Sequence, residues 1–167
     1  DGVAVTIIGL DADYNEIQET VILGDDSAGG TATTQEFLRI NRAYVSNGSE
    51  PTDDITIEQD GNVYAQITFP YNTTQQAVYT VPVNKKAYLV YADTSLEKQK
   101  EVVAKFMTRA PGGIFITGGI IGTTLSFQRE WVIPPVLDEK TDIEIRALAG
   151  ATTAISASMQ FVIEEKM

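Results

Sequence analysis

The side chains that most often carry chemistry in proteins are missing from this sequence. Its 167 residues include no histidine and no cysteine. Histidine is the commonest general base near neutral pH and a frequent metal ligand, while cysteine supplies nucleophiles, disulfides and thiolate ligands. A Ser-His-Asp triad, a cysteine nucleophile and a cysteine-ligated metal are therefore excluded. The composition predicts a protein that is not an enzyme and that holds no metal and no other cofactor.

One segment imitates part of a calcium-binding loop. Residues 11–15 (DADYN) place oxygen-bearing side chains at alternate positions, as such a loop requires. Glu16 then stands where the loop needs glycine, and Ile22 stands where it needs a bidentate glutamate. We expect a polar connection between strands, with a different calcium site that uses Asp11 or Asp13 as the alternative.

A glycine-rich run at residues 112–122 imitates a phosphate-binding loop. The run lacks the Gly-Lys-Ser/Thr ending and the helix that let such a loop wrap phosphate. Its glycines instead favour turns, a bulge or close packing between subunits. The 23 acidic residues also allow a glycosidase-like pair of carboxylates, an alternative that would make the protein a hydrolase.

Trp131 is the only tryptophan of the chain, in the segment LSFQREWVI. Its flat, amphipathic ring could stack on a sugar, and the seven tyrosines could add to such a surface. Packing in a core or at an interface is the favoured interpretation. Trp131 is therefore a candidate interface residue, with glycan binding as the alternative.

Residues 138–163 carry the clearest structural pattern. Ile143 and Ile145 alternate with Asp142, Glu144 and Arg146, and a second alternating run follows at 155–163. Because successive side chains leave opposite faces of a strand, this predicts two half-buried strands joined by a glycine-centred turn. The three charged residues share the wet face, where they can pair with a neighbouring strand or subunit, and are further candidate interface residues.

Similar runs recur along the chain and predict an all-β, antiparallel, jelly-roll-like sandwich. About eight to ten strands at intervals of roughly 8 to 15 residues form one domain spanning 1–167. Asp60-Gly61 predicts a type I′ hairpin turn, and residues 36–46 are apolar on both faces like a central strand. Residues 94–108 fit either a capped helix or a strand after a charged loop; the strand is favoured because its neighbours are strands.

The formal charge of −11 and the isoelectric point near 4.3 oppose binding to nucleic acid and to anionic membranes. The most apolar stretch, residues 112–125, is too short to span a bilayer. The chain begins at Asp1 without an initiator methionine, which fits an N-terminal segment that has been removed or left out.

Four stretches resemble jelly-roll structural proteins from the virions of tailed bacteriophages. They are the opening VAVTIIGLDADYNEIQETVIL, the strand FLRINRAYV, the pair KAYLVY and KFMTRAPGG, and the closing PPVLDEKTDIEIRALA with SASMQFVIEE. The match is loosest at SLEKQKE and GGIIG. The resemblance implies an antiparallel sandwich that forms homo-oligomers, with trimers among the assemblies it allows.

The resemblance also implies a function. We expect a capsid decoration or cement protein that stabilises the head, with the major capsid protein or other virion proteins as partners. It would be made in the host cytoplasm and located on the exterior of the capsid or in a fibre. The alternative is a receptor- or glycan-binding domain of a head or tail fibre.

Overall fold

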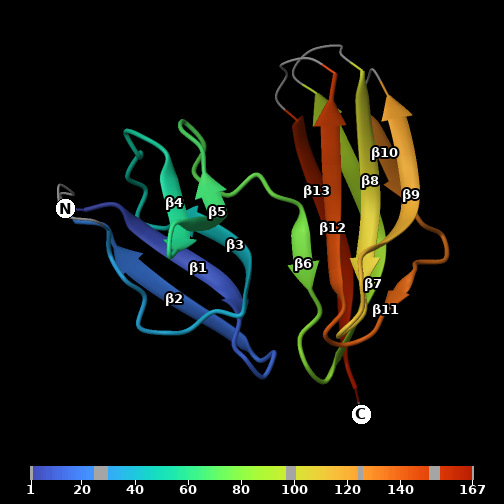
Figure 1. Cartoon of the computed structure of the whole chain (residues 1–167), viewed down its shortest axis with the longest axis horizontal. Helices are drawn as coiled ribbons and strands as arrows, with labels where there is room; N and C mark the ends of the chain where they lie inside the picture. The colour runs from blue at the N-terminus through green and yellow to red at the C-terminus, as the bar shows by residue number, and fades with distance from the viewer. Residues whose placement is uncertain (1, 25–29, 97–100, 124–125, 151–154, 167) are drawn as a thin grey trace. The chain divides into compact units, whose positions relative to one another are not determined.

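The computed structural model describes residues 2–24, 30–96, 101–123, 126–150 and 155–166. All regular structure in these ranges is β-strand, and every strand pairing is antiparallel (Figure 1). This confirms the predicted all-β, antiparallel class. Thirteen strands occur within these ranges, more than the eight to ten expected, and β6, β10 and β11 are four residues or shorter. No helix of the described ranges is long and apolar enough to cross a membrane.

Contacts group the chain into two compact units, Asp1–Gln75 and Gln76–Met167. Each unit has its own hydrophobic core. That the whole chain behaves as one domain, as the sequence suggested, stays a prediction.

The N-terminal unit contains a three-stranded sheet in the order β2-β1-β3, formed by Glu16–Ile22, Ala4–Leu10 and Arg39–Val45. Its buried core consists of Val5, Ile7, Val21, Ala43 and Ile67. The prediction that residues 36–46 form a central strand is wrong, since β1 takes that position. Ala43 of β3 lies in the core, and Ile40 and Val45 pack against it. Tyr44 bridges to Thr73 on the edge away from β1.

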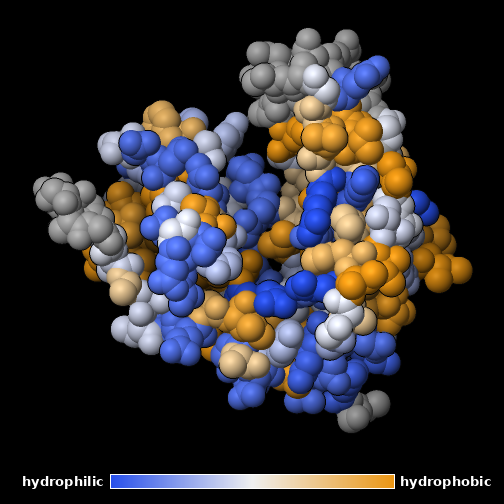
Figure 2. Space-filling view, in the orientation of Figure 1, coloured by the Kyte–Doolittle hydropathy of each residue, from blue (hydrophilic) through white to orange (hydrophobic). Residues whose placement is uncertain are grey.

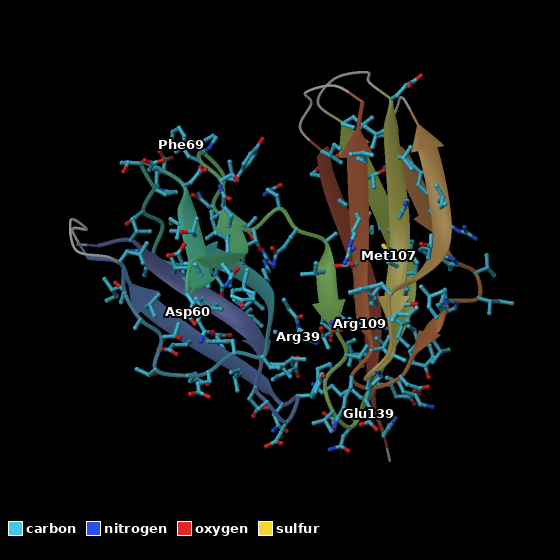
Figure 3. The ribbon with its side chains drawn as sticks, in the orientation of Figure 1. Arg39, Asp60, Phe69, Met107, Arg109 and Glu139 are labelled. Carbon is cyan, nitrogen blue, oxygen red and sulfur yellow. The ribbon has the colours of Figure 1, made fainter. Side chains whose placement is uncertain are left out.

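The second sheet of this unit is the hairpin of β4 (Ile55–Gln59) and β5 (Asn62–Ile67). Asp60 and Gly61 between them have φ values of 53° and 76°. Positive φ at both central residues is what a type I′ turn requires, so this predicted turn is confirmed (Figure 3).

The C-terminal unit has two four-stranded sheets. One has the order β6-β12-β8-β9, formed by Val78–Thr80, Asp142–Ala149, Val102–Arg109 and Ile116–Thr123. In the other, the long strand β7 (Lys85–Leu96) pairs with β13 (Ile155–Glu165) on one edge. On the other edge it pairs with β10 (Phe127–Glu130) and β11 (Val136–Leu137).

Two predictions about this unit have opposite outcomes. The strand interpretation of residues 94–108 is confirmed, because β7 continues to Leu96 and β8 starts at Val102. The closing pair of strands is found, but the two do not pair with each other: β12 pairs with β6 and β8, whereas β13 pairs with β7. The predicted turn is centred on Gly150, and residues 151–154, which follow it, lie outside the described residues. The two sheets share a core of Val81, Ala87, Leu89, Leu137 and Ile143.

Candidate interaction surface of the C-terminal unit

Asp142 lies at the start of β12, where three strands meet. Thr80 on β6 donates a hydrogen bond to its Oδ1 at 2.7 Å, and Arg109 on β8 donates from Nε to its Oδ2 at 2.7 Å. The register places all three residues opposite one another. Asp142 is only 8% exposed, so the expectation that it lies on a wet face is wrong. The physical reason is that β6 pairs along this end of β12 and brings Thr80 against the carboxylate.

Glu144 and Arg146 follow two and four residues later on the same face. Arg146 Nη2 lies 2.5 Å from Glu144 Oε1, so this pair forms along one strand and not with a neighbouring strand. The Arg146 side chain is 56% exposed, whereas that of Glu144 is 16% exposed. Exposed ion pairs of this kind contribute about 0 to 1 kcal/mol.

Phe115 links the two arginines of this face. The guanidinium of Arg109 lies 4.4 Å from the centre of the ring, and that of Arg146 lies 4.7 Å from it. Sequence reasoning missed Phe115 and Arg109, because they are distant from β12 in the sequence: Arg109 ends β8 and is labelled in Figure 3, and Phe115 lies in the loop after β8. The structure therefore brings Asp142, Glu144 and Arg146 together, in a cluster that two further residues complete.

Beyond these charges, the outer face of the sheet carries several exposed apolar residues together with the exposed Lys105, which lies opposite Ile120 and Arg146. Leu148 is 75% exposed on β12, and it pairs across the ladder with the exposed Val103 on β8. Ile120 on β9 is 64% exposed. Figure 2 shows hydrophobic residues gathered over the upper ends of β8 and β12. We call Val103, Ile120 and Leu148 the outer apolar patch.

Strand β9 forms one edge of the sheet. Among the described residues it pairs only with β8, so the backbone groups along its other edge have no strand partner there. No charged residue occurs between positions 110 and 127. Edge strands usually carry charges, prolines or bulges that block pairing with another chain. β9 has one bulge, opposite Phe106 and Met107, but no charge and no proline, so residues 119–123 beyond the bulge are open to a partner strand.

Trp131 lies apart from the charged cluster, just after β10. Its amide donates to the carbonyl of Val90 at 3.0 Å, and its half-buried ring lies 6.4 Å from the ring of Phe106. The guanidinium of Arg129 lies over the Trp131 ring at 5.0 Å. The favoured packing interpretation agrees with these contacts, since the ring belongs to the shell around the core of the unit.

The Trp131 ring also lines a cavity of about 200 Å³ within the C-terminal unit. The wall comes from both sheets and includes Ala92, Thr94, Ala104, Phe106, Gly119, Phe127, Arg129 and Ile145. Residues of β9 and β10 are part of this wall, and Figure 1 draws both strands near one edge of the unit.

The predicted polar connection at residues 11–15 is a turn that uses its own oxygens. Asp11 Oδ1 accepts from the backbone amides of Asp13 and Asn15 at 2.9 and 2.8 Å, and its Oδ2 accepts from the Asn15 side chain at 3.0 Å. These bonds, led by that from the Asn15 side chain, lower the pKa of Asp11. No group of acidic residues that could hold a metal ion occurs in the described part of the chain.

Two further titratable groups are held by bonds within the C-terminal unit. Glu139 accepts from the Asn84 amide at 2.6 Å and from Lys166 Nζ at 2.9 Å, and these bonds, the first above all, lower its pKa. Tyr88 donates to Glu164 at 2.6 Å, which raises the pKa of the phenol. Glu139 and Tyr88 both form hydrogen bonds to residues distant in the sequence, and neither lies in the cavity wall.

Comparisons with protein-family models, with curated proteins and with solved structures found no match.

Proposed function

We propose that this chain is a structural protein of a tailed-phage virion, a capsid decoration or cement protein that adds stability to the head. It acts by covering surface and not by catalysis. The four stretches that resemble such proteins suggest the virion, and the all-β fold is compatible with it. The observation that carries the binding role is the open edge of β9, with the outer apolar patch beside it.

The β9 edge suits contact with another subunit because the sequence around it carries no charge. A chain with a formal charge of −11 repels a second copy of itself wherever acidic surfaces meet. Residues 110–127 carry no charge, so contact there avoids that repulsion. Pairing of β9 with a strand of another subunit would satisfy free backbone groups and cover Ile120. We therefore propose β9 as the contact for a homo-oligomer or for the major capsid protein.

The jelly-roll part of the proposal concerns the C-terminal unit. The chain crosses repeatedly between the two sheets: β6, β8, β9 and β12 belong to one, and β7, β10, β11 and β13 to the other. Repeated crossing between two sheets is a property of jelly rolls and other Greek-key sandwiches, and it supports a chain path of that kind.

The glycan-binding alternative receives less support. Stacking on a sugar needs an accessible aromatic face, and the guanidinium of Arg129 already lies over the Trp131 ring. A sugar would have to displace this arginine or approach the other side of the ring. Loss of glycan-array binding in Trp131→Ala would favour the alternative over the capsid role.

The test begins with the mass of the purified chain, measured by light scattering coupled to size exclusion. We expect an oligomer, and we expect Ile120→Lys to dissociate it because the lysine brings charge and hydration to the β9 edge. Val132→Lys is the matched control, since Val132 is fully exposed in the loop after β10. Co-sedimentation with phage heads that lack decoration then tests binding to the capsid.

The outcomes separate the parts of the proposal. A monomer that sediments with heads supports a cement protein that assembles only on the lattice. A monomer that binds no heads contradicts the capsid role. An oligomer that survives Ile120→Lys rules out β9 as its contact.

A further inference from the structure

The cavity of the C-terminal unit arises from small residues at inward positions. Ala92 on β7, Ala104 on β8 and Gly119 on β9 all line it, and in a well-packed sandwich such positions carry larger side chains. A Cβ atom added to Gly119 would meet nothing within 4 Å. The cavity therefore has room for a guest that the side chains of the sandwich leave unfilled. Its volume of about 200 Å³ exceeds the roughly 150 Å³ of an apolar protein cavity that binds benzene.

The hydroxyl group of Thr94 gives the cavity a polar group that can bind a polar part of a ligand. Thr94 is 3% exposed, it lines the cavity, and its Oγ1 has no hydrogen-bond partner among the described residues. Buried hydroxyl groups are almost always satisfied, so this group is poised for a partner. Rotation about χ1 exchanges the hydroxyl and the methyl of threonine, which lets the hydroxyl turn toward a guest.

Arg129, an exposed residue, supplies a positive charge at the edge of the same cavity. Asp93 also lines the cavity, and its carboxylate accepts hydrogen bonds from Ser158. Arg129 pairs with Ala92 across the ladder, which places it on the inward face of β10. Its guanidinium lies over the Trp131 ring, and it makes no ion pair with the described residues. A guanidinium in this position favours a carboxylate over a neutral head group.

We propose that the cavity binds a small amphiphilic carboxylate, with an apolar body of about six carbons and a single acidic head. The body packs against Phe106, Phe127 and Ile145, and the head lies between Arg129 and the Thr94 hydroxyl. This site goes beyond the capsid role, which requires no ligand.

Trp131 gives a direct readout, since it is the only tryptophan and it lines the cavity. We would titrate the full chain with hexanoate, 1-hexanol and acetate and follow tryptophan fluorescence, with the thermal midpoint as a second measurement. Hexanoate should give a saturable change with a Kd of about 1 mM or tighter, as expected for so small a ligand. 1-Hexanol should bind at least about threefold more weakly, and acetate should not saturate.

Variants locate the site. Gly119→Leu places a side chain into the cavity and should abolish the hexanoate response. Gly122→Leu is the matched control: it is on the same strand with free space at its Cβ, but it pairs with the exposed Val103 and so faces outward. Thr94→Val keeps the shape of the side chain and should weaken hexanoate binding about threefold or more.

The proposal is overturned if hexanoate gives no saturable change, in which case the cavity holds water alone. Equal affinities for hexanoate and 1-hexanol would overturn the carboxylate class. Unchanged binding in Gly119→Leu would place the response elsewhere. Should Gly119→Leu fail to fold, Thr94→Val decides, because an isosteric change at a buried, unbonded hydroxyl preserves the packing.

Discussion

Arg109 on β8 holds Asp142 on β12 through a single carboxylate oxygen, which both its Nε and its Nη2 contact. The other oxygen is left for Thr80, so the carboxylate bridges three strands. Little of Asp142 is open to water, with 12% of its side chain exposed. Asp142 is therefore buried, whereas the alternation of residues along the strand predicts that it faces solvent.

Asp142→Ala should lower the free energy of unfolding by about 2 to 4 kcal/mol, because it leaves the guanidinium of Arg109 and the hydroxyl of Thr80 without their shared acceptor. Urea unfolding followed by circular dichroism measures the loss. Asp138→Ala, at an exposed position on the approach to β12, is the control and should change the value by less than about 0.5 kcal/mol. Equal effects of the two substitutions would refute the bridging role.

Phe115→Leu should cost about 0.5 to 2 kcal/mol, since it removes the aromatic face that lies against Arg109 and Arg146. A double-mutant cycle with Arg146→Gln isolates the contribution of that contact. Ile114→Ala, next to Phe115 and 80% exposed, should be nearly neutral. A coupling energy of zero in the cycle would show that the ring and the guanidinium merely lie side by side.

Glu139 should make the stability of the protein depend on pH. Its pKa is lower in the folded protein, so its contribution is present above the pKa of the unfolded chain. That contribution disappears as the pH falls through the folded value. Glu139→Gln should therefore reduce the loss of stability on acidification, measured by urea unfolding across the acidic range. Glu165→Gln, at an exposed position at the end of β13, is the control for the loss of one negative charge.

Gly61→Ala should destabilise the β4–β5 hairpin by roughly 1 kcal/mol, because Gly61 has a φ of 76°, where a Cβ atom is strained. Gly122→Ala is the control: its backbone is outside that region, and its Cβ would have free space. Thermal denaturation compares the two. A stable Gly61→Ala protein would mean that the turn can change its type without cost.

Local patterns in the sequence predict the local structure well. The Asp60-Gly61 turn and the strand nature of residues 102–109 follow from nearest neighbours and from periodicity. Alternation assigns faces within a strand but not the partner strand, so it does not reveal that β12 pairs with β6 and β8 while β13 pairs with β7. The candidate site likewise depends on strand pairing that local patterns do not reveal, since Asp142 and Arg109 meet only when β8 and β12 are in register. The cavity depends on small residues from several strands, and no single segment reveals it.

The pairing of β7 with β13 has a consequence for how the protein is made. Leu96 pairs with Ile155 and Lys85 with Glu165, so this ladder joins segments far apart in the chain. In the N-terminal unit, β1 pairs with β2 and β4 with β5, which are successive strands. Contacts between distant segments form slowly. During translation, the N-terminal unit can fold while one edge of β7 stays uncovered until β13 has left the ribosome.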